Sequence, residues 1–375
     1  MTPAYDEAWF AGRAVAGVRG LAAYDPGHDV AAMRERTEWL VELGSNENPY
    51  GPSPAARAAV LDALHGMHRY PDPRGTRLKH ALAALHGVEP ACILLGNGSH
   101  ELLMQFAQAF AGAGDDVVYP RYGFAVFALA TQAAGANARV APALPVESAM
   151  PLGHDVDALL AAITPATRLL YIANPNNPTG TWIDAATLQR FVAAVPPEVI
   201  VVVDEAYAEL ADAPDYRSAL ALTAAHGNLV VTRTFSKAYA LAGLRCGYAI
   251  AAPGFVAVME RLRESFNVNS AALAACEAAL GDAAHLEWSR ARNAEQRTVL
   301  ADALSRRGLR VLRSQTNFLL VGLGERAPAI EAHLLQRDVV LRPMGGYGLH
   351  GWTRITVGSA DENRRLLAAL DEVLA

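Results

Sequence analysis

Lysine is almost absent from this chain of 375 residues. Lys79 and Lys237 are the two lysines among its 32 basic residues, and all the others are arginines. A codon bias toward arginine is the simplest interpretation of the shortage. It still has a chemical consequence, because an enzyme that forms an imine through a lysine amine has two candidate positions here.

Clusters of positive charge are also missing. The chain carries 38 acidic residues against 32 basic ones, which gives a formal net charge of -6. Binding to nucleic acid or to an anionic membrane surface depends on clustered positive charge, so neither is an expected partner. No apolar stretch is long enough to span a bilayer. The segment 1–13 lacks a basic region followed by an apolar core, so we expect no signal peptide.

Cysteine is rare, and its positions exclude two common structural devices. Cys92, Cys246 and Cys276 are odd in number and widely separated, and no Cys-x-x-Cys pair occurs. This pattern supports neither a disulfide framework nor a structural zinc site. The histidines do not show the spacing of a helical metal site, so we expect no catalytic metal. A reduced cytoplasm is the expected location.

The residues that are present describe a globular α/β chain. Hydrophobic residues make up 52% and charged residues 19%. Helical patterns alternate with short apolar segments that we interpret as strands: Ile93–Leu95, Val117–Tyr119, Arg139–Ala141, Leu169–Ala173, Val199–Val203, Leu229–Thr232 and Cys246–Ala251. Continuous apolar strands favour burial on both faces and hence a mostly parallel central sheet of about seven strands, flanked by helices.

The pattern of predicted helices and strands changes after Asn267, which indicates a second region. A long helix over Ala283–Arg306 is followed by the strands Asn317–Val321 and Arg354–Val357 and a final helix, which together predict a smaller α+β domain. The expected division is an N-terminal arm of residues 1–45 that joins the small domain, a large domain of residues 46–266, and a small domain of residues 267–375.

Unusual residues follow four of the predicted strands. Ligands of open α/β sheets bind at the carboxyl ends of the strands, so these segments are expected to converge on one rim. Together they offer an amine, a carboxylate, hydroxyls, an amide and a helix N-terminus, in the segments 96–99, 174–180, 204–207 and 233–237. Each segment alone is consistent with an ordinary turn or helix cap.

Helical periodicity distinguishes the two lysines. In the predicted helix Arg77–Leu85, the side chains of Leu78, Leu82 and Leu85 mark the apolar face. Lys79 lies about 100° from Leu78 around this helix, which predicts a solvated surface lysine. Lys237 follows a buried strand, where desolvation would lower its pKa and make the amine nucleophilic.

Several motifs carry a resemblance to a known family. The segments Asn176–Gly180, Asp204–Tyr207 and Thr234–Lys237, with Arg245 eight residues further on, resemble fold-type I aminotransferases that use pyridoxal 5′-phosphate (PLP). The likeness extends over nearly the whole chain. It is similar to the histidinol-phosphate aminotransferases in particular through the segments Gly44–Tyr50, Arg69–Pro71, Ser236–Arg245 and Arg354–Gly358.

The resemblance implies a role for each residue of the rim. Lys237 would hold PLP through an imine and later act as the general base. Asp204 would pair with the pyridine nitrogen and keep it protonated. Asn177 and Tyr207 would hydrogen-bond the phenolic oxygen, and Tyr122 would lie against the ring.

The cofactor phosphate has its own implied set of partners. By resemblance it would be held by a guanidinium, two hydroxyls and two backbone amides at a helix start, from Arg245, Thr234, Ser236, Ser99 and His100. Tyr70 would reach the phosphate of a neighbouring subunit, which implies a homodimer with two shared sites.

Substrate binding is implied by two arginines and a tyrosine. Arg354 would clamp the carboxylate of glutamate, and with Arg342 it would hold a substrate phosphate. Tyr24 matches a tyrosine that closes over the substrate. The implied reaction converts L-histidinol phosphate and 2-oxoglutarate to imidazole acetol phosphate and L-glutamate. Two positions depart from the family pattern: His100 replaces an acidic residue, and the segment 348–352 lacks a proline after Gly-Leu.

Other functions remain open at this point. The same chemistry could act on aromatic amino acids, and the same cofactor could serve decarboxylation of a phosphoamino acid or oxygen-dependent oxidation. A nicotinamide-dependent dehydrogenase needs a Gly-x-Gly-x-x-Gly turn, and Glu101 occupies the position of the last glycine. A PLP-binding regulator would need a DNA-binding module, for which the residues before the motifs show no pattern.

Overall fold

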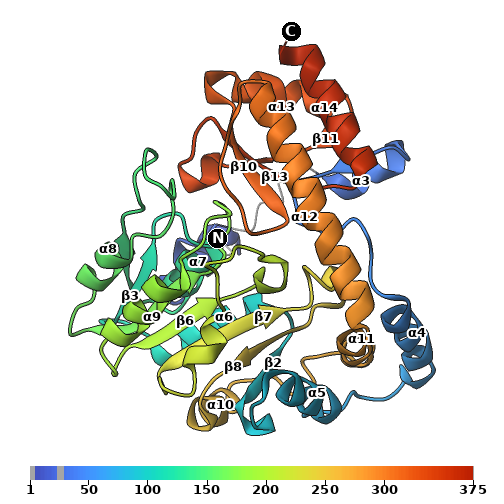
Figure 1. The fold of residues 1–375 in the computed structure, drawn as a ribbon. Helices are drawn as coiled ribbons and strands as arrows, with labels where there is room; N and C mark the ends of the chain where they lie inside the picture. The colour runs from blue at the N-terminus through green and yellow to red at the C-terminus, as the bar shows by residue number, and fades with distance from the viewer. Residues whose placement is uncertain (1–4, 23–28, 375) are drawn as a thin grey trace.

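The computed structural model describes residues 5–22 and 29–374, and a large sheet dominates its lower half (Figure 1). Seven of the described strands form this sheet in the order β2-β8-β7-β6-β5-β3-β4. Their bounds are β2 Ile93–Gly96, β3 Asp116–Pro120, β4 Asn137–Ala141, β5 Thr167–Ala173, β6 Ile200–Asp204, β7 Leu229–Thr234 and β8 Gly247–Ile250.

The directions of the strands bring the carboxyl ends of six of the seven to one edge. The strands from β4 across β3, β5 and β6 to β7 are parallel, while β8 runs antiparallel to both of its neighbours, β7 and β2. Strand β2 therefore points the same way as β7. The predicted α/β fold with a mostly parallel sheet of about seven strands is confirmed.

Helices cover both faces of the large sheet, as the continuous apolar strands predict. On β6, the side chain of Val202 packs in one hydrophobic cluster, while Val201 and Val203 pack in the cluster on the opposite face. Successive side chains of a strand point to opposite faces, so this strand is buried on both sides. The covering helices are α6 Ser99–Phe110, α7 Ala125–Ala133, α8 Val156–Ala161, α9 Ala185–Ala194 and α10 Pro253–Met259.

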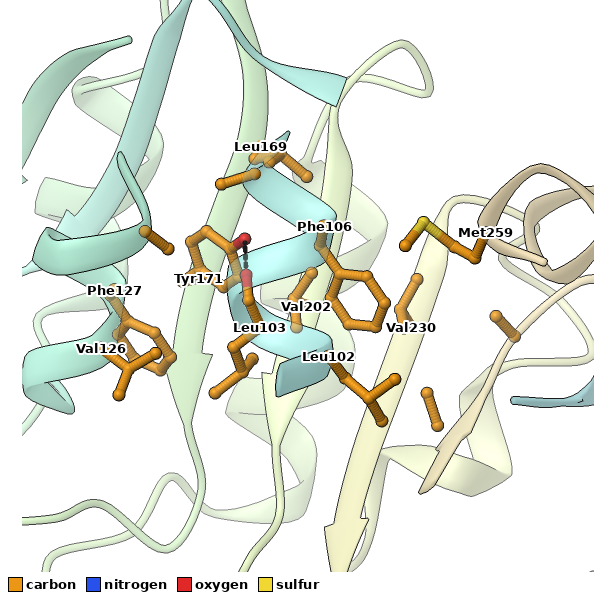
Figure 2. Close-up of a cluster of buried hydrophobic side chains, with 14 of the residues drawn as sticks. Leu102, Leu103, Phe106, Val126, Phe127, Leu169, Tyr171, Val202, Val230 and Met259 are labelled. Atoms are coloured by element: carbon orange, nitrogen blue, oxygen red, sulfur yellow. Dashed lines mark hydrogen bonds between the residues drawn. The ribbon is translucent and has the colours of Figure 1, made fainter. Parts of the chain in front are cut away.

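Aromatic side chains fill the cluster between the sheet and helices α6 and α7. Figure 2 shows Phe106, Phe127 and Tyr171 packed there with Leu102, Val202 and their neighbours. The rings of Phe127 and Tyr171 are stacked with centroids 5.0 Å apart. The buried Tyr171 hydroxyl donates a hydrogen bond of 2.9 Å to the Leu103 carbonyl, which joins β5 to α6.

A helical layer packs beside strands β2 and β8. It consists of α4 Pro54–Ala63, α5 Thr76–His86 and α11 Ser270–Gly281, the last of which was not predicted from the sequence. The prediction of a solvated Lys79 is wrong, because its Nζ lies 2.7 Å from Glu260 Oε1 and its side chain is only 15% exposed. The residues after α10 pack along the polar side of α5, which helical periodicity alone does not reveal.

The second sheet and its helices form the upper part of the molecule (Figure 1). Four of the described strands have the order β12-β13-β10-β9, with bounds β9 Arg310–Val311, β10 Phe318–Gly322, β12 Arg342–Pro343 and β13 Trp352–Thr356. Helices α13 Ala327–Gln336 and α14 Ala360–Leu374 accompany it, and the long helix α12 Ala283–Arg306 runs from α11 up to this sheet.

The N-terminal segment packs into this upper part. Strand β1 (Val41–Glu42) pairs in parallel with β11 (Val339–Val340), and Val41 and Leu43 lie in a hydrophobic cluster with residues of α12, α13 and α14. In the described part of the chain before β1 there are three short helices, namely α1 Glu7–Ala11, α2 Ala16–Arg19 and α3 Val30–Arg36. Seven single 3-10 turns in the described residues complete the elements, at 64–66, 90–92, 208–210, 219–222, 242–244, 324–326 and 345–347.

Two further observations concern membranes and cysteines. Among the described residues, no helix combines the length and apolarity needed to cross a bilayer. Cys92, Cys246 and Cys276 are all free thiols, and the latter two are buried in the layer of α5 and α11.

The buried aromatic cluster generates a prediction about stability. Phe106 is fully buried and packs edge-on against Phe255, so Phe106→Ala removes a large apolar contact and leaves a cavity. We expect a loss of about 3–5 kcal/mol in the free energy of unfolding, measured by urea titration. Phe10, which is 58% exposed, is the matched control, and Phe10→Ala should change this free energy by less than about 1 kcal/mol. Equal losses in the two variants would contradict the assignment of the core.

Candidate active site

The carboxyl ends of strands β5, β6 and β7 lie side by side. The strand register places Ala173 beside Asp204 and Asp204 beside Thr232. The segment that begins at Asn174 therefore starts next to Asp204, and Thr234 lies two residues beyond Thr232. Three of the four predicted segments thus meet on one edge because parallel strands end there.

Asp204 provides a buried carboxylate at this edge. Its side chain is only 4% exposed, and its Oδ1 accepts a hydrogen bond of 2.7 Å from Thr232 Oγ1. Burial raises the pKa of the Asp204 carboxyl to about 6, although the bond from Thr232 opposes that shift. A cationic group in contact with the Asp204 carboxyl would stabilise its ionised form.

The amine of Lys237 is held by two backbone carbonyls. Its Nζ donates to Asn46 O at 3.0 Å and to Ser45 O at 3.4 Å. Burial, and then the nearby Arg354 guanidinium, lower the pKa of Lys237 to about 8. The amine is therefore far more often neutral near pH 7 than an ordinary lysine, which is the condition for a nucleophile or a general base.

Tyr207 and Asn177 add neutral polar groups beside the lysine. The Lys237 Nζ lies 5.9 Å from the centroid of the Tyr207 ring. Burial raises the pKa of Tyr207 to about 12, so its hydroxyl keeps its proton at neutral pH. Asn177 Oδ1 accepts a hydrogen bond of 2.7 Å from Arg354 Nη1, which leaves the amide N–H groups as the donors that Asn177 can offer elsewhere.

Two arginines stand opposite each other on the second sheet. Arg342 of β12 and Arg354 of β13 are direct cross-strand partners, so their side chains share one face. Arg354 is buried, donates to the Gly44 carbonyl, and has a buried Nε without a hydrogen-bond partner among the described residues. Burial lowers the pKa of Arg354, and the Arg342 charge adds to this effect. A paired set of guanidiniums with an unmet donor is suited to an anion.

A second group of donors, suited to an anion, lies at the start of α6. Arg245 Nη1 lies 3.4 Å from Ser236 Oγ, and a Cβ built on Gly98 would lie 2.6 Å from Arg245 Nη2. A Cβ on Gly247 would lie 2.4 Å from the backbone nitrogen of Ser99, so only glycine permits this approach. Arginine, hydroxyl groups and the first N–H groups of a helix thus meet in one place.

The other residues predicted to hold the cofactor phosphate lie close by. The Thr234 hydroxyl accepts a hydrogen bond of 3.1 Å from the Ser236 backbone N–H. Partial burial, and then the Arg245 guanidinium, lower the pKa of the His100 imidazole, so its neutral form is favoured. The departure from the family pattern at position 100 therefore adds no positive charge near neutral pH, while its backbone N–H remains available at the helix start.

The three tyrosines predicted for the site differ in where the structure places them. The Tyr122 carbonyl accepts a hydrogen bond of 2.7 Å from Asn176, and its ring packs in a cluster with Tyr347 and Trp352 at the edge of the site. Tyr70 lies outside this group, with an 82% exposed ring stacked on Phe266. Tyr24 lies outside the described residues.

Sequence reasoning missed several residues that shape the site. Thr232 bonds to Asp204, and Asn46 contacts both Tyr207 and Lys237. Arg233, next to Thr232, forms a buried ion pair with Glu205 at 2.8 Å and another with Glu209 at 2.7 Å. These pairs tie the ends of β6 and β7 together. A charged residue inside an apolar strand, such as Arg233, was the signal that could have revealed the pair.

Comparisons with known proteins agree with this geometry. Residues 38–370 match the family described as aminotransferase class I and II. The chain is 45% identical to histidinol-phosphate aminotransferase 2 of Ralstonia nicotianae over 365 residues, 96% of each chain. It is 46% identical to the protein of the same name from Methylococcus capsulatus, covering 96% of this chain and 98% of the relative.

Solved structures give the same result. The histidinol-phosphate aminotransferase of Sinorhizobium meliloti, in complex with pyridoxal-5′-phosphate, is 32% identical with a TM-score of 0.88, covering 96% of this chain and 97% of the other. An aspartate aminotransferase from Thermus thermophilus with maleate shares the fold at 24% identity and a TM-score of 0.81, over 95% and 99% of the chains. This chain therefore belongs to the class I and II aminotransferase family.

Proposed function

We propose that this protein is a PLP-dependent aminotransferase that moves the amino group of L-histidinol phosphate to 2-oxoglutarate, giving imidazole acetol phosphate and L-glutamate. The observation that carries the proposal is the meeting of a desolvated lysine and a buried aspartate with an arginine pair from the other sheet. The names of the relatives support the choice of substrate.

The residues present fit the cofactor. Asp204 is a buried carboxylate that needs a cationic partner, and Lys237 supplies an amine beside it. Glycines at 98 and 247 let Arg245 and the start of α6 come close enough to surround a phosphate. When bound, PLP supplies an aldehyde that takes up amino groups and a ring that withdraws electrons from the carbon bearing them.

Each residue around the cofactor would have its own role in the reaction. Asp204 would hold a proton on the pyridine nitrogen, and the hydroxyl of Tyr207 with the amide of Asn177 would donate to the phenolic oxygen. Lys237, partly neutral at physiological pH, would take the proton from the substrate Cα and return it during the amino transfer. Tyr122 would limit the ring's movement from one side.

The phosphate of the cofactor would be anchored at a distance from the chemistry. We assign it to Arg245, the hydroxyls of Thr234 and Ser236, and the backbone N–H groups of Ser99 and His100. Charge-assisted bonds of this kind orient the cofactor and supply binding energy without taking part in proton transfer.

The arginine pair would recognise the two alternating substrates. Arg354 can hold the carboxylate of glutamate in a two-pronged contact, and Arg342 beside it adds the second charge that a doubly charged phosphate requires. Tyr24, assigned by resemblance, would cover the substrate.

Aromatic amino acids are the second candidate donors. Tyr122, Tyr347 and Trp352 pack in one cluster with Met344 and Leu349 near the arginine pair. Such a surface suits an imidazole ring and also a phenyl ring. The observation favours a flat ring on the substrate without deciding which one.

We also propose a homodimer with sites shared between subunits. The stacked Tyr70 and Phe266 lie at the surface, and a few residues before Tyr70 in the chain the apolar side chains of Leu61, Leu64 and Met67 are exposed as well. Exposed patches of this kind are typical of protein interfaces. Tyr70 would then reach the cofactor phosphate of the partner subunit.

The proposed domain division assigns residues 1–45 and the C-terminal region to the small domain and residues 46–266 to the large one. The pairing of β1 with β11 supports the first part. Helix α11 packs against α4 and α5, which supports a boundary after α11 rather than at residue 267.

We also propose a cytoplasmic location, which the free thiols support.

Reduction with borohydride tests the lysine assignment. After PLP is added, borohydride should fix the cofactor on the peptide containing Lys237, identified by mass spectrometry. Capture needs the neutral amine, so its initial rate should rise as the pH increases through about 8, because burial lowers the pKa of Lys237 to about 8. An ordinary lysine would show this rise near pH 10.4. Label on Lys79 instead, which is ion-paired with Glu260, would refute the assignment.

Replacement of Arg342 tests the phosphate clamp. Arg342→Ala should lower kcat/KM for histidinol phosphate roughly 10- to 100-fold, the effect of losing a charged hydrogen bond, and lower it less for glutamate. Arg337→Ala, which removes an exposed ion pair with Glu372, is the matched control and should leave both values near those of the unaltered protein. Equal losses for both substrates in Arg342→Ala would remove the proposed role.

A panel of amino donors tests the function itself. With 2-oxoglutarate as acceptor, we expect glutamate to form fastest from L-histidinol phosphate and more slowly from phenylalanine, tyrosine and histidinol, measured by an enzymatic glutamate assay. A higher kcat/KM for phenylalanine would favour the aromatic alternative. Formation of carbon dioxide or hydrogen peroxide without glutamate would indicate decarboxylation or oxidation instead.

A further inference from the structure

Asn46 occupies a central position in the site. Its side chain is 2% exposed, and its φ of 56° lies in the left-handed region, where asparagine is tolerated better than most residues. Non-glycine residues in this conformation persist where the surrounding contacts hold them, and such positions cluster at functional sites.

Three parts of the chain meet at this residue. The Asn46 side-chain Nδ2 donates to the Tyr207 hydroxyl at 3.0 Å, across 161 residues. Its backbone N–H donates to Thr356 Oγ1 at 3.0 Å, across 310 residues. Its carbonyl accepts from Lys237 Nζ at 3.0 Å and from Asn317 Nδ2 at 3.0 Å.

The direction of the hydrogen bond to Tyr207 follows from this network. Because the Asn46 backbone N–H already donates to Thr356 Oγ1, the Thr356 hydroxyl proton is available for Asn46 Oδ1, which lies 3.3 Å away. That contact turns the Nδ2 end of the amide toward Tyr207. The Tyr207 oxygen therefore accepts from Asn46, and its own proton points to another acceptor.

We propose that Asn46 is a positioning residue that sets the direction of the Tyr207 hydrogen bond, so that the tyrosine hydroxyl must donate to the cofactor. The proposal rests on the proposed function, in which Tyr207 faces the phenolic oxygen of PLP. A donor there stabilises negative charge on that oxygen and lowers the proton affinity of the bound cofactor. The Asn46 side chain thus acts through Tyr207, while the contact of this residue with the Lys237 amine comes from its backbone carbonyl and does not depend on the side chain.

Other charged and titratable groups also face the Tyr207 and Lys237 side chains. They come from the segment around β1, the end of β6, the turn after Lys237, the turn before β13 and β13 itself, and they are Glu42, Glu47, Asp204, Arg245, Tyr347 and Arg354. All of these groups remain when Asn46 alone is changed, so a double-mutant cycle with Tyr207 isolates the proposed interaction.

The decisive variant is Asn46→Asp, which keeps the shape but replaces the donor with an acceptor. The carboxylate would accept a hydrogen bond from the Tyr207 hydroxyl, so the tyrosine could no longer donate that bond to the cofactor. The measurement is the pH midpoint of the visible absorbance change of the protein reconstituted with PLP. We expect Asn46→Asp to raise this midpoint by roughly one to two pH units, the size of a lost hydrogen bond to a charged oxygen.

Two comparisons separate this effect from the added charge. Ser45 is adjacent to Asn46 in the chain, and its exposed side chain bonds to Glu42 and not to Tyr207. Ser45→Asp therefore introduces a negative charge next to Asn46 without replacing the donor to Tyr207, and it should shift the midpoint by less than half as much. In a Tyr207→Phe background, where there is no hydroxyl proton to redirect, Asn46→Asp should shift it no more than Ser45→Asp does. Equal shifts by Asn46→Asp with and without the Tyr207 hydroxyl would overturn the proposal.

A second variant keeps the test valid if Asn46→Asp does not fold, which a thermal melt would reveal. Asn46→Gly suits the positive φ and frees the Tyr207 hydroxyl to rotate. It should raise the midpoint in the unaltered background and leave it unchanged in Tyr207→Phe, and the same shift in both would overturn the proposal. If the unaltered protein shows no visible absorbance with PLP, the proposed function fails and this inference fails with it.

Discussion

Burial of the Lys237 amine is the constraint on which the rest of the site depends. An ammonium group removed from water is costly unless carbonyls or anions surround it, and desolvation moves the proton equilibrium toward the neutral amine. The structure meets this requirement with two backbone carbonyls of the segment 45–46 and no direct ion pair among the described residues. Near neutral pH the amine is therefore mostly protonated, and a minor fraction is in the neutral, reactive form.

The carbonyls that receive this amine belong to a segment held mainly by the second sheet. Residues 44–46 follow β1, which pairs with β11. The Gly44 carbonyl accepts a hydrogen bond from Arg354, and the Asn46 carbonyl accepts one from Asn317. The Asn46 backbone N–H donates to the Thr356 hydroxyl. Asn177, in the turn that follows β5 of the large sheet, bonds to the same Arg354. The chemical groups of the site thus reach their positions only when the two sheets are docked, which explains why a buried network of polar bonds, rather than apolar packing alone, joins them here.

How much of this could be predicted from the sequence depends on the range of the contacts. The apolar strands and the residues at their ends are local signals, so the large sheet, Asp204 and Lys237 could be predicted. Asn46 lies 161 residues from Tyr207 and 310 from Thr356, and no periodicity reports contacts at such separations. Arg342 and Arg354 could be identified as a pair by resemblance, but the cross-strand register that places them face to face appears only in the structure. The ion pair of Lys79 was missed for the same reason, since its partner lies far away in the sequence.

We propose Lys237 as the attachment point of PLP, at the rim where Asp204 and the arginine pair meet. A crystal structure of the protein grown with PLP tests it most directly. We expect electron density that continues from the Lys237 Nζ into the cofactor, with the ring nitrogen facing Asp204 and the phosphate at Arg245. Density for PLP attached to Lys79, or bound away from Asp204, would contradict it.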